Sequence, residues 1–376
     1  MCDNRTMPED VETITGRLAA HLRRAREEAH LTQEDLARAI PIDGSAVVKI
    51  ENGTRRVSAT ELLAISRALD LPIDQLVNDA PPSVISRRSD PAAALQTPTM
   101  DRAVEQAARN VTFLLNREIL VPADRTLLKL PANHDEACNA ANRIREIIGE
   151  PTGPLSPLQD VAESLGLYAF VHKFGAEGGD ASYNDLDQAG VAVINADVDA
   201  GRRRFNLAHE IGHHVFGDKY APEVTINPAS DDEKFIQSFA AHLLMPPQGI
   251  LDDWRSEPDH RLAAMKLASS YRVSWSAVCA HLLNLDLVDH SGYRELIEVP
   301  PRKGEMMELG MYWVPELGTP CVPSGYARAV VSNYRVGKLT ATRAVGLLAG
   351  TITEDDLPDR DEIPLRAVAR DFNPLT

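Results

Sequence analysis

Residues 205–214 read Phe-Asn-Leu-Ala-His-Glu-Ile-Gly-His-His and contain the pattern His-Glu-x-x-His. On an α-helix, side chains four residues apart lie one turn above each other, so we expect His209 and His213 to project side by side. Two imidazole nitrogens at that spacing can both reach one tetrahedral Zn²⁺. Glu210 follows the first histidine, where it could take a proton from water at the metal. The stretch therefore predicts a helix that carries two metal ligands and a general base.

A third metal ligand is expected from Glu233, which follows His213 by 20 positions. It begins a segment whose apolar residues recur at helical spacing as far as Pro246-Pro247, which predicts a largely buried helix. A carboxylate in the first turn of that helix could complete a His₂Glu site with one position open for water, as in catalytic zinc centres. Ser230 and Glu233 also have the spacing of a capping box, in which the glutamate only satisfies the helix N-terminus. Asp231 and Asp232 are the alternative carboxylates.

These two segments resemble the ImmA/IrrE family of bacterial zinc metallopeptidases. The resemblance rests on residues 204–214 and on the pattern Glu-x-x-Ile-x-x-Phe-Ala-Ala-x-Leu-Leu-Met-Pro from Glu233, and it covers roughly residues 140–290. It implies a gluzincin-type, zincin-like α+β fold in which His209, His213 and Glu233 bind Zn²⁺ and Glu210 is the catalytic base. Two features depart from the usual family pattern, namely Ile236-Gln237 and His242.

The N-terminal region predicts five short helices, over residues 16–29, 32–40, 44–51, 58–69 and 72–77. A helix, a short turn and a second helix whose first residues face outward make up a helix-turn-helix. The sequences Leu-Thr-Gln-Glu-Asp-Leu-Ala at 31–37 and Ser-Ala-Val-Val-Lys-Ile-Glu-Asn-Gly-Thr-Arg at 45–55 have this form. The region resembles the Cro/C1-type (XRE) repressor domain throughout.

That resemblance implies a DNA-binding surface in this region. Gln33 would contact phosphate, and Arg55 and Arg56 would hold the DNA backbone. The residues that would face the major groove are Gly44, Ser45, Ala46 and Lys49. Charge supports this only weakly, because residues 13–58 contain eight Lys/Arg and six Asp/Glu. A dimerisation or partner-docking module of the same shape therefore stays an alternative to DNA binding.

Composition limits the class of protein. The chain has 376 residues, which is long enough for two or three domains, and 44% of them are hydrophobic, which is enough for ordinary cores. Its formal net charge is −16. It has no apolar run of 18 residues and a polar N-terminus, so we expect a cytoplasmic protein without a membrane partner. The four cysteines are dispersed and form no C-x-x-C pair, which argues against a disulfide framework or a zinc knuckle.

The sequence predicts a multidomain, mainly α protein. We expect a helix-turn-helix domain at 1–80, a linker rich in Pro, Ser, Ala and Arg at 81–100, a metallopeptidase domain at 101–290, and a small C-terminal α+β region of unknown role at 291–376. Residues 302–321 are expected to form strands and turns. The strand expected at 190–195 is a candidate edge to which an extended substrate could add.

The predicted function is that of a regulator that binds a double-stranded DNA operator, as a homodimer, and carries a zinc-dependent peptidase. Its expected substrate is a specific repressor or antitoxin-like protein, or the chain itself, in a stress or mobile-element response. Tyr183, His172 and His242 are the candidate donors to the oxyanion. The alternatives are a non-catalytic regulator that contains zinc and an antitoxin-like binding protein. Glu210 separates these classes, because a structural zinc site is normally filled by four protein ligands and needs no base.

Overall fold

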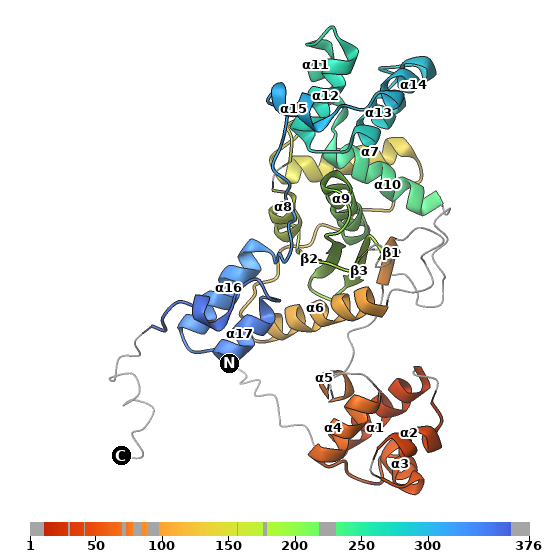
Figure 1. The fold of residues 1–376 in the computed structure, drawn as a ribbon, viewed down its shortest axis with the longest axis vertical. Coiled ribbons are helices and arrows are strands. Elements are labelled where there is room, and N and C mark those ends of the chain that lie inside the picture. Colours follow the sequence, from red (N-terminus) through yellow and green to blue (C-terminus); the bar gives the residue numbers. More distant parts are fainter. Residues whose placement is uncertain are drawn as a thin grey trace. The chain divides into compact units, whose positions relative to one another are not determined.

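The computed structural model describes residues 11–28, 31–40, 42–69, 73–77, 85–88, 98–155, 157–175, 179–217 and 231–361. The chain divides into two compact units, Met1–Pro81 and Pro82–Thr376. Both are dominated by helices, and one small sheet lies in the second unit (Figure 1). The prediction of a multidomain, mainly α chain is confirmed. Among the described residues, no helix is both long and apolar enough to cross a membrane.

The described residues of the first unit form five helices, as predicted. They are α1 (Val11–Glu28), α2 (Gln33–Ala39), α3 (Gly44–Glu51), α4 (Ala59–Ala68) and α5 (Ile73–Val77). The three middle helices each begin at a side chain that accepts a backbone N–H, namely Thr32, Asp43 and Ser58. One core holds the unit together, with fully buried aliphatic side chains from all five helices: Leu22, Leu36, Val47, Ile50, Ile65 and Leu76.

The sheet of the second unit has four strands in the order β1-β3-β4-β2. These are β1 (Ile85–Arg88), β2 (Leu167–His172), β3 (Ala181–Asp185) and β4 (Gly190–Asn195). Strand β4 runs parallel to β2 and antiparallel to β3, and β1 is antiparallel to β3. The prediction that 190–195 is an edge strand is therefore wrong. An apolar run such as Gly-Val-Ala-Val-Ile-Asn is instead typical of a central strand buried on both faces.

Helices cover both faces of the sheet. Alternate residues of β2 and β4 belong to two different cores, as the two-residue period of a strand requires. One core contains residues of α7 (His134–Ile147), α8 (Leu158–Ser164), α9 (Ala200–Phe216) and α10 (Asp231–Leu244). The other contains residues of α6 (Pro98–Asn116), α16 (Ser324–Arg335) and α17 (Ala341–Leu347). The sheet thus holds α9, the helix with the His-Glu-x-x-His pattern, against one of its faces (Figure 1).

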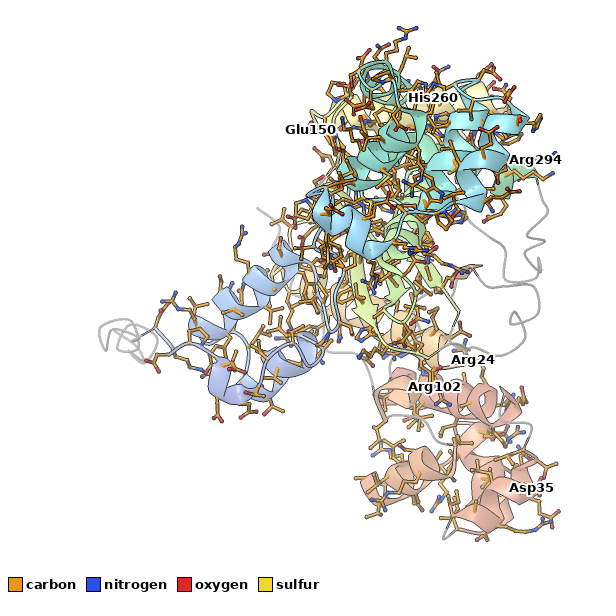
Figure 2. The ribbon with its side chains drawn as sticks, turned by 45° about the horizontal axis from the view of Figure 1, so that its top comes forward. Arg24, Asp35, Arg102, Glu150, His260 and Arg294 are labelled. Atoms are coloured by element: carbon orange, nitrogen blue, oxygen red, sulfur yellow. The ribbon has the colours of Figure 1, made fainter. Side chains whose placement is uncertain are left out.

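Four further helices extend the core that contains α9. They are α11 (Pro247–Arg255), α12 (His260–Tyr271), α13 (Trp275–Asn284) and α14 (His290–Glu298). Helices α12 and α13 contribute buried residues to this core, so they pack as part of the fold. The exposed side chains of the second unit include Glu150, His260 and Arg294 (Figure 2).

Two boundary predictions need correction. The predicted linker 81–100 contains β1 and the start of α6, because four residues of extended backbone pair with β3. The predicted α+β region at 291–376 is helical over its described residues. It contains α15 (Lys303–Glu308), α16, α17 and the 3₁₀ turn Glu354–Asp356, and its one described β interaction is the isolated bridge between Cys321 and Val171. It shares a core with α6 and the sheet, so it is part of the second unit.

Candidate metal centre and DNA-binding helix

Helix α9 places two histidines side by side, as their spacing predicts. It begins at Asp199, whose carboxylate accepts the Arg202 N–H, and ends at Gly217, a left-handed residue with φ of 65°. His209 and His213 lie one turn apart, with their ring centroids 4.8 Å and their Nε2 atoms 3.1 Å from each other. Both side chains are buried, so their rings face the protein interior and not bulk water.

Glu233 approaches the two histidines from α10. Its Oε1 lies 2.9 Å from Nε2 of His209, and its Oε2 lies 3.8 Å from Nε2 of His213. The ligand atoms of all three residues lie within 4.8 Å of one another. The neighbouring Asp232 is exposed, which favours Glu233 as the carboxylate of the cluster. The side chain of Asp231, and Ser230 with its proposed capping box, lie outside the described residues.

A glycine lets the two helices come this close. A Cβ atom on Gly212 would lie 2.8 Å from Cγ2 of Ile236 and 3.1 Å from Cδ1 of Phe239, both on α10. These distances are shorter than ordinary carbon–carbon contacts. Gly212 therefore permits the contact that brings Glu233 to the histidines. Ile236, which departs from the family pattern, is one of the residues that fill the space over it.

The donor set of the cluster fits zinc. Two imidazole nitrogens and a carboxylate oxygen are the ligand types of catalytic zinc sites, which leave one further position for water or substrate. Glu210, next to His209 on α9, is completely buried, and its charge contributes to raising the pKa of Tyr183. The predicted base therefore lies in the same buried environment as the predicted ligands.

A polar network from β3 and the segment before α7 lies against the cluster. The Tyr183 ring is stacked on that of His213, with an interplanar angle of 18° and centroids 6.3 Å apart. Its hydroxyl lies 3.2 Å from Nδ1 of His214 and donates to Asp185 at 2.9 Å. Arg125 forms an ion pair with Asp185 at 2.6 Å and donates to the His214 carbonyl at 2.9 Å. The network ties α9 to the sheet.

Burial and charge fix the protonation states in this network. Burial, and secondarily the charge of Arg125, lowers the pKa of His214 to about 4, so its ring is neutral at pH 7. Its Nε2 lies 2.9 Å from the carbonyl of Leu165, which only accepts, so the proton is on Nε2. Burial raises the pKa of Tyr183 well above its usual value. The sequence did not predict this network. Two signals for it were present, namely a histidine, His214, directly after a proposed ligand and a tyrosine, Tyr183, within a strand.

The three candidate oxyanion donors lie in different places. Tyr183 lies against His213, but its hydroxyl already donates to Asp185. The ring of His172 lies against Phe174, and that of His242 lies 5.0 Å from His281. The assignment of an oxyanion donor stays a prediction.

In the first unit, α3 presents one face to solvent and one to the core. Ser45 and Lys49 are exposed and Gly44 is half-buried, as expected of residues at a groove-facing surface. Ala46 is only 7% exposed, so little of its side chain is open to a partner, and its assignment to that surface stays a prediction. Val48, 38% exposed, lies on the outer face and was missed.

The two arginines after α3 differ in their surroundings. Arg56 is exposed. Arg55 is half-buried and donates to Oε1 of Glu61 at 2.7 Å. The guanidinium of Arg55 is already paired with a carboxylate, which competes with a DNA phosphate for it. Arg56 is therefore the better candidate of the two for a contact with the DNA backbone.

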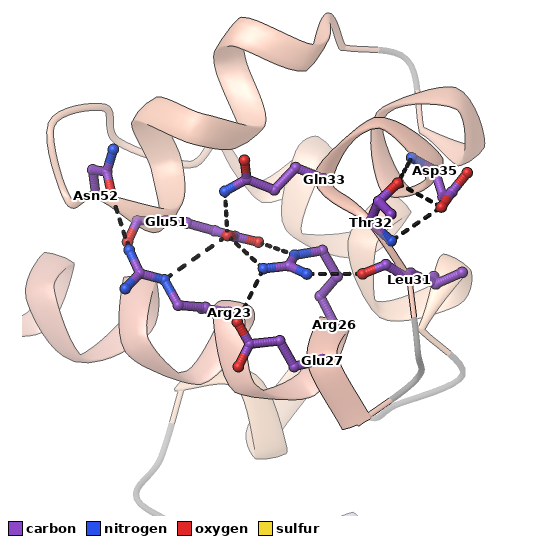
Figure 3. Close-up of polar contacts among 9 residues, drawn as sticks. All are labelled: Arg23, Arg26, Glu27, Leu31, Thr32, Gln33, Asp35, Glu51 and Asn52. Atoms are coloured by element: carbon purple, nitrogen blue, oxygen red, sulfur yellow. Dashed lines mark hydrogen bonds and ion pairs between the residues drawn. The ribbon is translucent and has the colours of Figure 1, made fainter.

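Gln33 belongs to a buried polar network (Figure 3). Its amide donates to Glu51 at 2.7 Å, and Arg26 donates to both oxygens of the same carboxylate at 2.7 and 3.1 Å. Arg23 donates to the Glu51 carbonyl and to Asn52. Burial alone would raise the pKa of Glu51, but the hydrogen bonds from Arg26 and Gln33 bring that pKa below its ordinary value. The side chain of Gln33 thus joins α2 to α3, whereas the sequence predicts a phosphate contact.

Comparison with known proteins agrees with both resemblances. Residues 22–76 match the helix-turn-helix family model. A 77-residue stretch is 38% identical to an uncharacterized transcriptional regulator in the ATPase CF(0) region of Rhodospirillum rubrum, and covers 71% of that protein and 19% of this chain. The chain belongs to the helix-turn-helix transcriptional regulators. In this regulator, residues 162–283 also match the IrrE N-terminal-like domain of peptidase family M78. The regulator thus combines a helix-turn-helix with a region similar to the IrrE N-terminal-like domain.

Solved structures were also compared with the regulator. The restriction-modification controller protein C.AhdI from Aeromonas hydrophila is 34% identical over 16% of this chain and 94% of its own, with a TM-score of 0.16. The competence regulator ComR from Streptococcus vestibularis is 13% identical over 81% of this chain and 95% of its own, with a TM-score of 0.17. PlcR from Bacillus thuringiensis, solved with the peptide PapR7 and DNA, is 13% identical over 89% of this chain and 93% of its own, with a TM-score of 0.18. TM-scores this low carry no argument about the fold of the regulator.

Proposed function

We propose that the regulator is also a zinc-dependent peptidase, with His209, His213 and Glu233 as metal ligands and Glu210 as the base. The observation that carries this proposal is the convergence of the three ligand residues in one buried cluster, with Glu210 buried on the same helix. The match of residues 162–283 to a peptidase family supports it. A site built only to hold zinc would need a fourth protein ligand, and the cluster in the described part of the chain contains three.

The chain's own residues divide the chemistry between them. When bound, zinc supplies a Lewis acid that lowers the pKa of water toward 7. Glu210 accepts a proton from the water whose oxygen attacks the scissile carbonyl carbon. It then returns that proton to the nitrogen as the C–N bond breaks, so one water is consumed for each bond cut. Tyr183 holds the ring of His213 by stacking, and Asp185 and Arg125 fix Tyr183 in turn.

The proposed substrate is a specific protein, namely a repressor or antitoxin-like protein or the chain itself, cut in a stress or mobile-element response. Burial of the cluster supports selectivity, because His209, His213 and Glu233 are each at most 7% exposed. A peptide must therefore enter the protein in an extended form to reach them. The first unit would bring the peptidase to a double-stranded operator, acting as a homodimer.

The test of the peptidase compares wild type with Glu210→Gln. We expect the variant to keep its zinc content and lose activity by about 10²–10⁴-fold, because the base is removed while the ligands remain. New protein N-termini would be sequenced in host cells that express either form, under DNA damage and oxidative stress. Identical N-termini in the two strains would favour a non-catalytic zinc regulator or an antitoxin-like binding protein. Loss of zinc from the variant would show that Glu210 is not the base.

The DNA-binding proposal predicts a graded effect of three arginine and lysine substitutions. Lys49→Ala and Arg56→Ala should each weaken operator binding and reduce the slope of log K against log salt by about 1, because each removes one phosphate or groove contact. Arg55→Ala should have a smaller effect on the slope, since Arg55 is paired with Glu61. Arg67, exposed on α4, provides the control. An equal response to Lys49→Ala and Arg67→Ala in a salt titration would contradict the role of α3.

A further inference from the structure

One edge of the sheet is occupied by a short segment of the same chain. Strand β1 pairs antiparallel with β3 in the register Ile85 to Asn184, Ser86 to Tyr183, Arg87 to Ser182 and Arg88 to Ala181. In sequence, β1 lies between α5 of the DNA-binding unit and α6 of the second unit. Among the described strands it pairs with β3 alone, so it forms the outer edge of the sheet on that side.

Strand β3 is the strand that contacts the candidate metal cluster through a described side chain. Tyr183, in its centre, is stacked on His213, and its hydroxyl lies 3.2 Å from Nδ1 of His214. Any extended chain paired with the outer edge of β3 therefore runs beside the strand that touches a proposed metal ligand. The residue opposite Tyr183 in the present register is Ser86.

The opposite edge of the sheet does not offer an equivalent place. The outer side of β2 is partly covered, because the Ala169 carbonyl accepts from Gln159 at 2.7 Å and the Val171 N–H donates to the Cys321 carbonyl at 3.0 Å. Strand β2 is also separated from β3 by β4. An extended peptide that adds a strand near the cluster must therefore use the edge that β1 occupies.

We propose that the outer edge of β3 receives the extended backbone of the peptidase's substrate, and that β1 is an intramolecular occupant that competes with it. This inference rests on the proposed peptidase function. Strand addition satisfies the backbone N–H and C=O groups of β3 whichever chain supplies the partner, so one edge accepts one strand at a time. A tethered competitor acts at an effective concentration in the millimolar range, which suppresses binding of a free peptide. Because β1 follows the DNA-binding unit in the chain, events at that unit are covalently linked to access at the peptidase.

The experiment measures peptide binding in the full chain carrying Glu210→Gln. The probe is a fluorescent peptide with the sequence of residues 83–90, Ser-Val-Ile-Ser-Arg-Arg-Ser-Asp. An opened variant adds Ser86→Pro and Arg87→Pro, because proline cannot donate to a ladder and neighbouring residues of a strand direct their N–H groups to opposite sides. The matched control adds Ser86→Ala and Arg87→Ala, which keep both N–H groups. We expect the opened variant to bind the probe at least ~10-fold more tightly than the parent and the control.

Equal affinity of the opened variant and the parent would overturn the inference. A second measurement needs no substitution in β1. Excess unlabelled peptide added to the parent chain should speed hydrogen exchange at Ile85–Arg88, and unchanged exchange would also overturn it. The proposed function is tested separately with Glu210 intact. Tighter probe binding without hydrolysis of any peptide would show that β1 competes with a peptide for the edge, but would remove the peptidase and with it the role of that peptide as substrate. Hydrolysis at the same rate in the opened and control chains would support the peptidase and overturn the inference that β1 competes with the substrate.

Discussion

At the scale of single residues, the candidate metal cluster depends on Tyr183, which no part of the His-Glu-x-x-His pattern includes. Its ring stacks on His213, and its hydroxyl lies 3.2 Å from Nδ1 of His214. We expect Tyr183→Ala to lower zinc affinity by about 10–100-fold, measured by competition with a chelator, because outer partners orient metal ligands. Tyr183→Phe should cost less, since the stacked ring remains. Tyr168→Ala is the matched control, because Tyr168 is buried in the core on the opposite face; an equal loss there would mean that general destabilisation is the cause.

The same scale shows how far individual residues could be predicted. Spacing alone placed His209 and His213 together, because four residues make one turn of helix, and the structure brings Glu233 to them. Spacing could not supply the contact of Arg125 with His214, which are 89 positions apart and meet only through the tertiary fold. The surroundings of Ala46 and Gln33 could not be predicted for a similar reason. Their helices were predicted correctly, but which side of α2 and α3 faces the core depends on α1 and its Arg26.

At the scale of elements, the close contact of α9 with α10 depends on the absence of a side chain at Gly212. We expect Gly212→Ala to lower the free energy of unfolding by about 1–3 kcal/mol and to weaken zinc binding, because the new methyl group meets Ile236 and Phe239. Gly346→Ala in α17 is the control. That position is exposed with nothing within 4 Å of its added Cβ, so it should gain about 0.5–1 kcal/mol. Chemical denaturation and a chelator titration measure both effects, and normal zinc affinity in Gly212→Ala would count against helix spacing as the determinant of the site.

Helices were more predictable than strands. The periodic apolar pattern and the capping residues Thr32, Asp43 and Ser58 identify the helices of the first unit from local sequence. Strand β1 has only four residues within a stretch rich in Pro, Ser and Arg, and its partner β3 lies about a hundred positions away. The position of β4 inside the sheet was also not deducible, because strand order depends on which segments pair. The C-terminal region was expected to be α+β, but α16 and α17 pack their apolar sides on the sheet and α6.

At the scale of the whole molecule, the two units should lose stability in different pH ranges. In the second unit, burial and, secondarily, the charge of His134 lower the pKa of His242 to about 4, against the opposing charge of Asp135. Burial, with the neighbouring His242, lowers the pKa of His281 to about 3, opposed by the Met245 carbonyl that its ring contacts. An unfolded histidine titrates at about 6.5. Between pH 6.5 and these lowered values the unfolded state binds more protons, so stability is complete above pH 6.5 and is lost as the pH falls.

The first unit should lose stability only at lower pH. The pKa of Glu51 is below its ordinary value, so this carboxylate stabilises the folded state above about pH 4.3 and loses that effect as the pH falls through its folded pKa.

The sequence offers a direct way to separate the units, because residues 1–81 contain no Phe, Trp or Tyr. Tryptophan fluorescence therefore reports the second unit alone, whereas far-ultraviolet circular dichroism reports the helices of both. In urea titrations from pH 7 to pH 4.5, we expect the fluorescence midpoint to fall while a circular-dichroism component persists. His242→Gln with His281→Gln should flatten the fall, and a midpoint independent of pH in wild type would show that these histidines are not neutral in the folded protein.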